Sequence, residues 1–370
     1  MSNLTEPVLV MIRVLLLSVC AAAAASSVAT AAAAPSGQDR ATAAGRGLVG
    51  SPAPRMVLKT IDGQVIDLGS LYGKKAVYLK FWATWCVPCR EQMPHFEHAF
   101  ETAGPDLAVI AINAGFNDSL EDVQTYRKRL GIHMPIVIDD GTLGAALNLR
   151  VTPQHVIIGR DGRIQYVGHL ADSRLDAALV AARTGAEVAA TAKTSSGAAS
   201  AGGGDSPHAA DAAALGVGDK LPDLSVTTLN GRSVHLLDAN AKRTTVLVFL
   251  SPWCESYLAT SRPGLSANCR KVREQVETLA HGGNIRWLGI ASGLWASRGE
   301  LASYRDENKV TIDLTLDESG ALFRTFRVMS VPTLLVVDPS GRIVRRIEGS
   351  DQNVGSELKA LASAPATPRG

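Results

Sequence analysis

Residues 76–90 read AVYLKFWATWCVPCR, an apolar run that leads into a Cys-x-x-Cys pair, Cys86 and Cys89. The run predicts a buried strand, and the pair then begins a helix. A cysteine in the first turn of a helix meets unpaired amide donors and the positive end of the helix dipole, which stabilise its thiolate. Cys86 is therefore the expected nucleophile, and Cys89, one turn further along, is the expected resolving thiol. Pro88 suits this turn, where its missing N–H costs nothing.

A zinc site or an inert disulfide is the alternative for such a pair. The zinc interpretation is disfavoured because no second Cys-x-x-Cys and no His-x-x-x-His lies in the same segment. We therefore expect thiol redox chemistry that uses no metal and no other cofactor. A nucleic-acid partner is not expected, because the net charge is only +2 and no concentrated basic face is evident.

Residues 1–34 are typical of a secretory signal peptide. Arg13 supplies the positive charge, residues 14–19 begin the apolar region, and small residues around Ala29 to Ala34 offer cleavage sites; Met11 is a second candidate start. The strongly apolar part is shorter than the roughly 20 residues of a membrane span. We expect a periplasmic protein that contacts the membrane only through this segment or a redox partner.

The rest of the chain is organised as two similar halves. Residues 184–214 are rich in Ala, Gly and Ser and predict a flexible linker between domains at 48–183 and 215–362. Motifs repeat in order on both sides: an Asp62-Gly63 or Asn230-Gly231 hairpin, a strand ending in Trp-Cys, and a proline followed by a strand. We expect a strand at 107–113 and a helix at 120–130 in the first half, and a strand at 285–291 and a helix at 298–307 in the second. Alternating strands and helices followed by a hairpin predict an α/β fold with a mixed sheet.

Residues 48 to about 182 resemble the TlpA/ResA-type periplasmic thioredoxins. The resemblance is carried by residues 81–90, by Met93-Pro94, by Thr152-Pro153 before a strand, and by Asp161-Gly162. It implies two tandem thioredoxin-like domains, each a mixed central sheet flanked by helices. It also implies a cis Pro153 whose loop lies against Cys86, with Trp85, Pro88, Thr152 and Pro153 contacting substrate.

The same resemblance implies an oxidoreductase of protein disulfides. It implies a reductant recharged by a membrane thiol donor, as in cytochrome c maturation or copper-site assembly. The alternative is a scaffold protein, in which the second domain recognises a target and the first only protects the target's thiols.

The second half resembles the same fold but departs from the active-site pattern. Cys254 corresponds to Cys86, yet Tyr257 occupies the position of Cys89, and Val331-Pro332 corresponds to Thr152-Pro153. The insertion that includes residues 261–264 is expected to interrupt the helix and let Cys269 reach Cys254. Three interpretations stay open: a structural disulfide, which export favours, a second redox centre, or free thiols in a binding domain.

Two residues near the first site are candidate modulators. Lys80 lies on the strand where thioredoxins carry a buried acid, so it is expected either to stabilise a thiolate or to be neutral if buried. The alternative is a lysine whose stem packs while its ammonium reaches a carboxylate or solvent. His155 lies two residues beyond Pro153 and is a candidate for proton transfer, if its side chain faces the sulfurs.

Overall fold

The computed structural model describes residues 34–185, 214–237, 243–282, 285–351 and 354–363. Both domains described below belong to one compact unit, Pro35–Gly370. The expected signal segment, and the expected linker apart from its ends, lie outside the described residues. Within those residues no helix is both long enough and apolar enough to cross a membrane.

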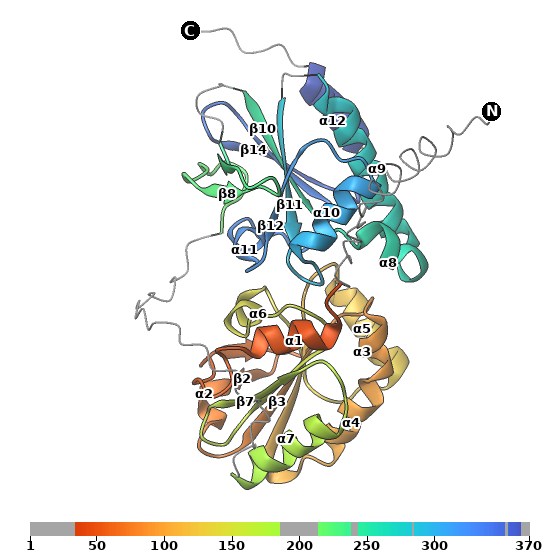
Figure 1. The fold of residues 1–370 in the computed structure, drawn as a ribbon. Helices are drawn as coiled ribbons and strands as arrows, with labels where there is room; N and C mark the ends of the chain where they lie inside the picture. Colours follow the sequence, from red (N-terminus) through yellow and green to blue (C-terminus); the bar gives the residue numbers. More distant parts are fainter. Residues whose placement is uncertain (1–33, 186–213, 238–242, 283–284, 352–353, 364–370) are drawn as a thin grey trace, which may run out of the picture. The chain divides into compact units, whose positions relative to one another are not determined.

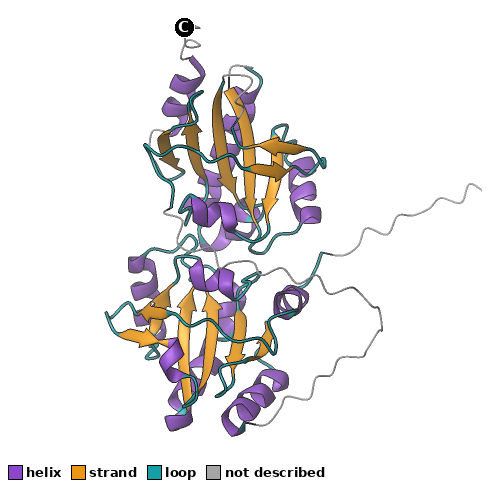
Figure 2. Cartoon of the chain, turned by 90° about the vertical axis from the view of Figure 1, so that its left-hand side faces the viewer, coloured by secondary structure: helices purple, strands orange, loops and turns teal. Residues whose placement is uncertain are grey.

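The first domain is a five-stranded mixed sheet with helices on both faces (Figures 1 and 2). Its strand order is β5-β4-β3-β6-β7, in which β3, β4 and β5 run parallel and β6 and β7 are antiparallel to their neighbours. The strands are β1 (Val57–Lys59), β2 (Val65–Asp67), β3 (Ala76–Trp82), β4 (Leu107–Asn113), β5 (Ile136–Ile138), β6 (Gln154–Ile158) and β7 (Ile164–Gly168). The helices are α1 (Gly37–Gly45), α2 (Leu68–Leu71), α3 (Val87–Glu91), α4 (Met93–Glu101), α5 (Leu120–Leu130), α6 (Thr142–Ala146) and α7 (Ser173–Thr184).

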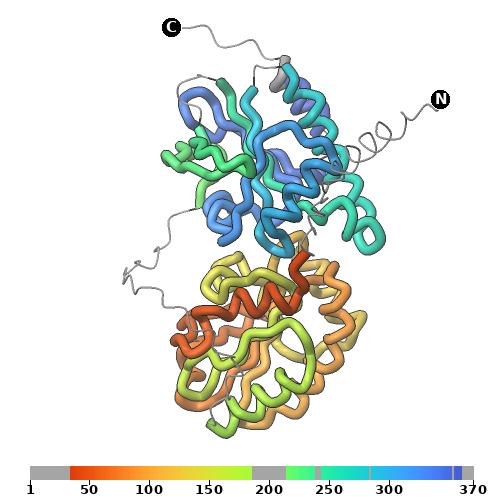
Figure 3. The backbone as a smooth tube through the Cα atoms, viewed as in Figure 1, coloured from red at the N-terminus to blue at the C-terminus, as the bar shows by residue number. Residues whose placement is uncertain are grey.

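The second domain repeats this topology with the sheet order β12-β11-β10-β13-β14. Its strands are β8 (Ser225–Thr227), β9 (Ser233–His235), β10 (Thr244–Leu250), β11 (Ile285–Ser292), β12 (Asp313–Asp317), β13 (Thr333–Val337) and β14 (Ile343–Glu348). Its helices are α8 (Cys254–Ser261), α9 (Pro263–Ala280), α10 (Arg298–Glu307), α11 (Ala321–Thr325) and α12 (Val354–Ser363). The colours of Figure 3 show that each domain is built from one continuous half of the chain. The predicted α/β class and the duplication are therefore confirmed.

Local signals explain why several elements agree with the prediction. Both predicted hairpins form, as β1-β2 and β8-β9. Helix α5 begins at a capping box made by Ser119 and Asp122, and α10 begins at Ser297, whose hydroxyl accepts from the Glu300 amide. Strand β3 is buried along its whole length, as its apolar run predicts.

Prolines divide the long helix that follows each Trp-Cys turn. In the first domain α3 ends at Glu91 and α4 begins at Met93, with Pro94 in its first turn. In the second domain Arg262 separates α8 from α9, and Pro263 is the first residue of α9. The predicted interruption at residues 261–264 is confirmed, and it allows α9 to return beside α8.

Helix α1 was not expected from the sequence. Ser36 and Asp39 form a capping box at its start, and the helix packs on the edge strand β7. Ala41 and Ala44 are fully buried in this contact. The folded first domain therefore includes residues that precede the predicted start at residue 48.

Candidate active site

The Cys-x-x-Cys pair lies at the end of the central strand β3, where α3 begins. Cys86 is the N-cap residue of α3, and the Cys89 backbone N–H donates to Cys86 Sγ at 3.2 Å. The two sulfurs form a disulfide in this structure. Cys86 is 1% exposed and Cys89 is fully buried. The amide donor stabilises a thiolate on the Cys86 sulfur. The burial of both sulfurs restricts their reaction to a partner that docks at the site.

The proline loop before β6 lies directly against this pair. The Thr152-Pro153 peptide bond is cis, as the resemblance implies, and Cys86 Sγ lies 3.3 Å from the Thr152 carbonyl oxygen. His169 fixes the loop from the far side, because its Nδ1–H donates to the Pro153 carbonyl at 2.7 Å. Burial lowers the pKa of His169, although this hydrogen bond acts in the opposite direction, so the neutral ring is favoured with its proton on Nδ1.

A buried carboxylate shapes the turn that precedes Cys86. Asp118 accepts from the Thr84 backbone N–H at 2.8 Å and from Asn113 Nδ2 at 2.7 Å. Burial raises the pKa of Asp118, although these hydrogen bonds act in the opposite direction. Trp85 is fixed in turn by its indole N–H, which donates to the Phe116 carbonyl at 2.7 Å. Together these contacts hold the ring beside the reactive sulfur in one orientation.

Lys80 is buried beneath the helical face of the sheet. Its side chain is fully buried, and its Nζ lies 5.3 Å from the centre of the Phe96 ring on α4 without any hydrogen-bond partner among the described residues. Burial lowers the pKa of Lys80 to about 7. The buried position contradicts an ammonium that reaches solvent, whereas the role of Lys80 as a neutral lysine or as a group that stabilises a thiolate stays a prediction.

His155 faces the same side of the sheet as Lys80, its partner in the β3-β6 register. Its Nδ1 is 2.8 Å from the Tyr78 hydroxyl and its Nε2 is 2.8 Å from Gln92 Oε1. The amide oxygen of Gln92 can only accept, so Nε2 carries the proton and Nδ1 accepts from Tyr78. Burial, followed by repulsion from Lys80, lowers the pKa of His155 well below its ordinary value. His155 therefore acts as a neutral bridge between strand and helix, and both of its nitrogens are occupied away from the sulfurs.

The second domain carries a disulfide at the corresponding place. Cys254 begins α8 and is bonded to Cys269 on α9. Cys269 Sγ lies 3.9 Å from the Val331 carbonyl, next to a second cis peptide bond at Val331-Pro332. The interpretation with free thiols is wrong for this form of the protein, whereas the choice between a structural and a redox-active disulfide stays a prediction.

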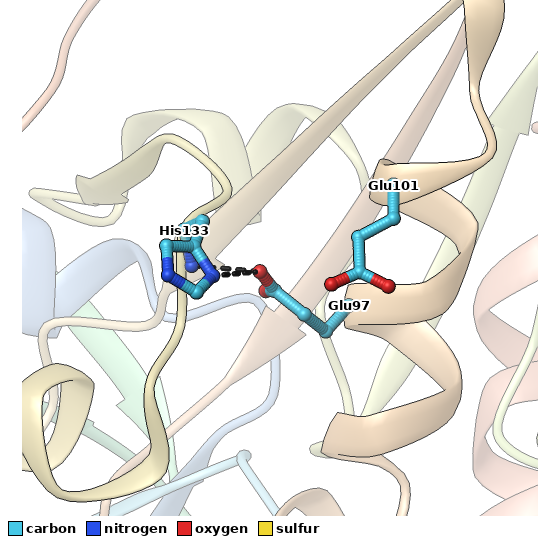
Figure 4. A group of neighbouring side chains, drawn as sticks. All are labelled: Glu97, Glu101 and His133. Atoms are coloured by element: carbon cyan, nitrogen blue, oxygen red, sulfur yellow. Dashed lines mark hydrogen bonds and ion pairs between the residues drawn. The ribbon is translucent and has the colours of Figure 1, made fainter.

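A separate group of polar side chains lies on α4 and before β5. Among the described residues, Glu97, Glu101 and His133 form the one cluster in which three metal-ligating side chains approach one another within 4.8 Å (Figure 4). The His133 ring and backbone N–H both contact Glu97 Oε1, at 3.0 and 2.7 Å. This ion pair explains the grouping, because it joins α4 to the loop that carries His133.

Sequence reasoning missed several residues that surround the reactive pair. Tyr78, Gln92 and His169 hold the proline loop and the helix, and no local pattern distinguishes them from ordinary core or surface residues. Residues of the second domain also reach this site: the Val87 backbone N–H donates to the Tyr257 hydroxyl at 3.1 Å. Only the folded chain reveals contacts across such sequence separations.

Comparisons with known proteins agree with this geometry. The model of the AhpC/TSA family matches residues 49–167 and again residues 217–346. The chain is 35% identical to the thioredoxin-like protein YneN of Bacillus subtilis over 130 residues, which are 34% of this chain and 76% of YneN. It is 38% identical to the thiol-disulfide oxidoreductase ResA of Halalkalibacterium halodurans over 117 residues, which are 31% of this chain and 65% of ResA, so less than two thirds of that relative is spanned.

A thioredoxin-family thiol:disulfide interchange protein from Chlorobium tepidum is 29% identical, with a TM-score of 0.32, and covers 36% of this chain and 96% of its own. The family match spans both halves of the chain and includes both Trp-Cys turns and both cis-proline loops. The chain therefore belongs to the AhpC/TSA family, and it contains the thioredoxin-like domain of that family twice.

Proposed function

We propose that this protein is an exported thiol:disulfide oxidoreductase that reduces protein disulfides with Cys86 and Cys89. The observation that carries the proposal is the placement of Cys86 Sγ, which accepts from the Cys89 amide and lies 3.3 Å from the carbonyl that precedes the cis-proline. The relatives named thiol-disulfide oxidoreductases support this class of activity.

The reaction follows from the positions of the two sulfurs. In the reduced protein the Cys86 thiolate attacks one sulfur of a substrate disulfide, which forms a mixed disulfide and releases the other substrate sulfur as a thiolate. Cys89 then loses its proton to solvent or to the released thiolate, and its sulfur attacks Cys86 Sγ. This second step releases the remaining substrate thiol and leaves the Cys86–Cys89 disulfide that the structure contains. Two electrons pass from the cysteine pair to the substrate.

Surrounding residues prepare the pair for this exchange. The Cys89 amide stabilises the Cys86 thiolate both as attacking group and as leaving group. Thr152, Pro153, Trp85 and Pro88 are the proposed substrate contacts, since the loop and the Trp-Cys turn border the same sulfur. We include in the proposal a periplasmic location and a membrane dithiol donor, which restores the reduced pair by the reverse exchange. Cytochrome c maturation or copper-site assembly would supply suitable protein substrates.

The test is turnover of a synthetic peptide that contains one disulfide, with dithiothreitol as electron donor and the full chain as catalyst. We expect catalysis by the native protein, none by Cys86→Ser, and accumulation of a peptide adduct on Cys86 in Cys89→Ser, detected by mass spectrometry. A Cys86→Ser variant that keeps its biological function would instead support the scaffold alternative.

The direction of electron flow is tested by the potential of the pair. Equilibration with dithiothreitol or glutathione buffers, followed by alkylation and peptide mass spectrometry, separates Cys86/Cys89 from Cys254/Cys269. A potential of about −270 mV, the value for thioredoxin, supports a reductant, whereas about −120 mV, the value for DsbA, contradicts it.

A further inference from the structure

The second domain contacts the first domain on the face that bears the reactive cysteines. The Trp253 ring lies 4.8 Å from the Trp85 ring, centre to centre, and the Tyr257 hydroxyl accepts from the backbone of Val87 between the two cysteines. Tyr257 is the residue that replaces the resolving cysteine in the second domain. The degenerate Trp-Cys turn thus packs directly on the intact one.

A charged contact extends this packing beyond the aromatic rings. Arg262, in the break between α8 and α9, donates from Nη2 to Asp118 at 2.9 Å and to the Thr84 hydroxyl, and it lies 3.4 Å from Asp122. Asp118 is the same carboxylate that orders the turn before Cys86. The second domain therefore contributes the cation that faces this buried acid.

The backbone contacts between the domains come in matching pairs. The Asn117 N–H donates to the Met329 carbonyl at 2.8 Å, and the Trp295 N–H donates to the Arg150 carbonyl at 2.9 Å. Asn117 and Trp295 each lie two residues after a glycine, at φ of 57° and 58°. Arg150 and Met329 each lie three residues before a cis-proline.

The two backbone hydrogen bonds are therefore equivalent: if the two domains changed places, each bond would take the position of the other. Trp85 and Trp253 are equivalent in the same way. Such a contact is isologous, as in a twofold dimer, although both halves belong to one chain. The loop after β4 in the first domain contacts the proline loop of the second domain, and the loop after β11 contacts the proline loop of the first.

These loops occupy the groups through which an extended polypeptide would bind. The Val331 N–H, immediately before one cis-proline, donates to Asn117 Oδ1 at 2.9 Å. The Thr152 hydroxyl, immediately before the other, accepts from the Trp295 indole N–H at 3.1 Å. Thr152 is fully buried and Val331 is 1% exposed. Neither proline loop is open to a partner protein while the domains are in contact.

We propose that the second domain is an intramolecular gate over the Cys86–Cys89 site, and that an extended substrate polypeptide must displace it to reach Cys86. This inference rests on the proposed function for its substrate, but the gate itself is a property of the fold. The contact also includes an Arg40–Glu300 ion pair and a bond from Arg150 to the Glu318 carbonyl. Interfaces between domains of one chain that combine aromatic and charged contacts are of the kind that opens reversibly.

The experiment measures access to Cys86 rather than turnover. The full chain is reduced, freed of reductant and pulsed with iodoacetamide across a range of pH, and modification of Cys86 is followed by mass spectrometry. If only the open form reacts, the rate is proportional to the open fraction. Arg262→Ala and Trp295→Ala remove contacts at two separate places, and Arg345→Ala, which removes an ion pair with Glu357 inside the second domain, is the matched control.

We expect both interface variants to increase the alkylation rate by about tenfold at every pH, the size of effect that loss of one partly buried contact has on an opening equilibrium. The pKa of the reactive thiol should not move, and Arg345→Ala should react like the native protein. Native rates in both interface variants overturn the gate. A shifted thiol pKa with no general acceleration overturns it too, because the residues then act on the sulfur itself.

The same variants distinguish the gate from the proposed function. If all proteins fail to reduce the peptide disulfide but the alkylation rates differ as expected, the gate stands and the oxidoreductase proposal fails. If the peptide is reduced equally fast by all of them and alkylation is unchanged, the oxidoreductase stands without a gate. Circular dichroism of each variant excludes unfolding as the cause of faster alkylation.

Discussion

Replacement of Lys80 by methionine should stabilise the first domain in a pH-dependent way. Lys80 is fully buried beneath α4, and its pKa is lowered from 10.5 to about 7 by burial. Below pH 7 both the folded and the unfolded chain carry the proton, so the folded state bears the whole cost of the buried charge. At about 1.4 kcal/mol per pKa unit, this difference corresponds to about 5 kcal/mol.

The sign of the pH dependence follows from the same two values. Between pH 7 and 10.5 the folded lysine is neutral while the unfolded lysine is charged, so the unfolded chain binds the extra proton and stability rises with pH. From pH 7.5 to 10 the contribution of Lys80 should improve by about 3 kcal/mol. Methionine has a similar unbranched shape and no charge, so Lys80→Met should be more stable at pH 7 and lack this slope.

Urea unfolding of both proteins at several pH values, with the disulfides kept oxidised, measures this difference. Titrating groups that do not interact with Lys80 cancel when the two proteins are subtracted, and His155, whose pKa repulsion from Lys80 lowers, is an exception. Lys74→Met, at an exposed position shortly before β3, is the matched control and should leave the slope unchanged. Equal slopes in native protein and Lys80→Met would refute the reasoning, because they would show that Lys80 keeps its proton in the fold.

Two further predictions concern the proline loop and the second disulfide. His169→Ala removes the donor to the Pro153 carbonyl and should raise KM for a peptide disulfide about fivefold with kcat and the potential unchanged, whereas His169→Gln should restore KM in part; steady-state kinetics and redox titration check this. The double variant Cys254→Ala, Cys269→Ala opens a loop of 15 residues and should destabilise the second domain by about 3 kcal/mol, measured by hydrogen exchange of β10. Peptide reduction by Cys86 should persist, and its loss would make this disulfide a redox centre instead.

Much of each domain could be predicted because its signals are local. The bounds of β4, α5 and α10 agree with the prediction, since apolar runs and capping residues define them within a few positions. The break before Pro263 could be predicted for the same reason. The cis bonds depended on a resemblance, because no local pattern distinguishes a cis from a trans proline before a strand.

The remainder depends on contacts between distant segments. Helix α1 was missed because its short, alanine-rich sequence has an ordinary cap and gains its stability from packing on β7. His169 and Arg262 resemble surface residues in sequence, yet one holds the proline loop and the other faces a buried acid. The sequence did not determine whether the His155 side chain faces the sulfurs. In the structure both of its ring nitrogens are bonded instead to Tyr78 and Gln92.

The matched pairing of Asn117 with Met329 and of Trp295 with Arg150 has a consequence for how the two halves can diverge. Two separate chains would have to associate at cellular concentration to form this contact. A covalent connection instead supplies an effective concentration in the millimolar range, so a contact too weak for a stable dimer is sufficient. Closure is then unimolecular and independent of protein abundance. One domain can therefore lack a resolving cysteine, as the second domain does with Tyr257 at that position, while the first domain retains the reactive pair.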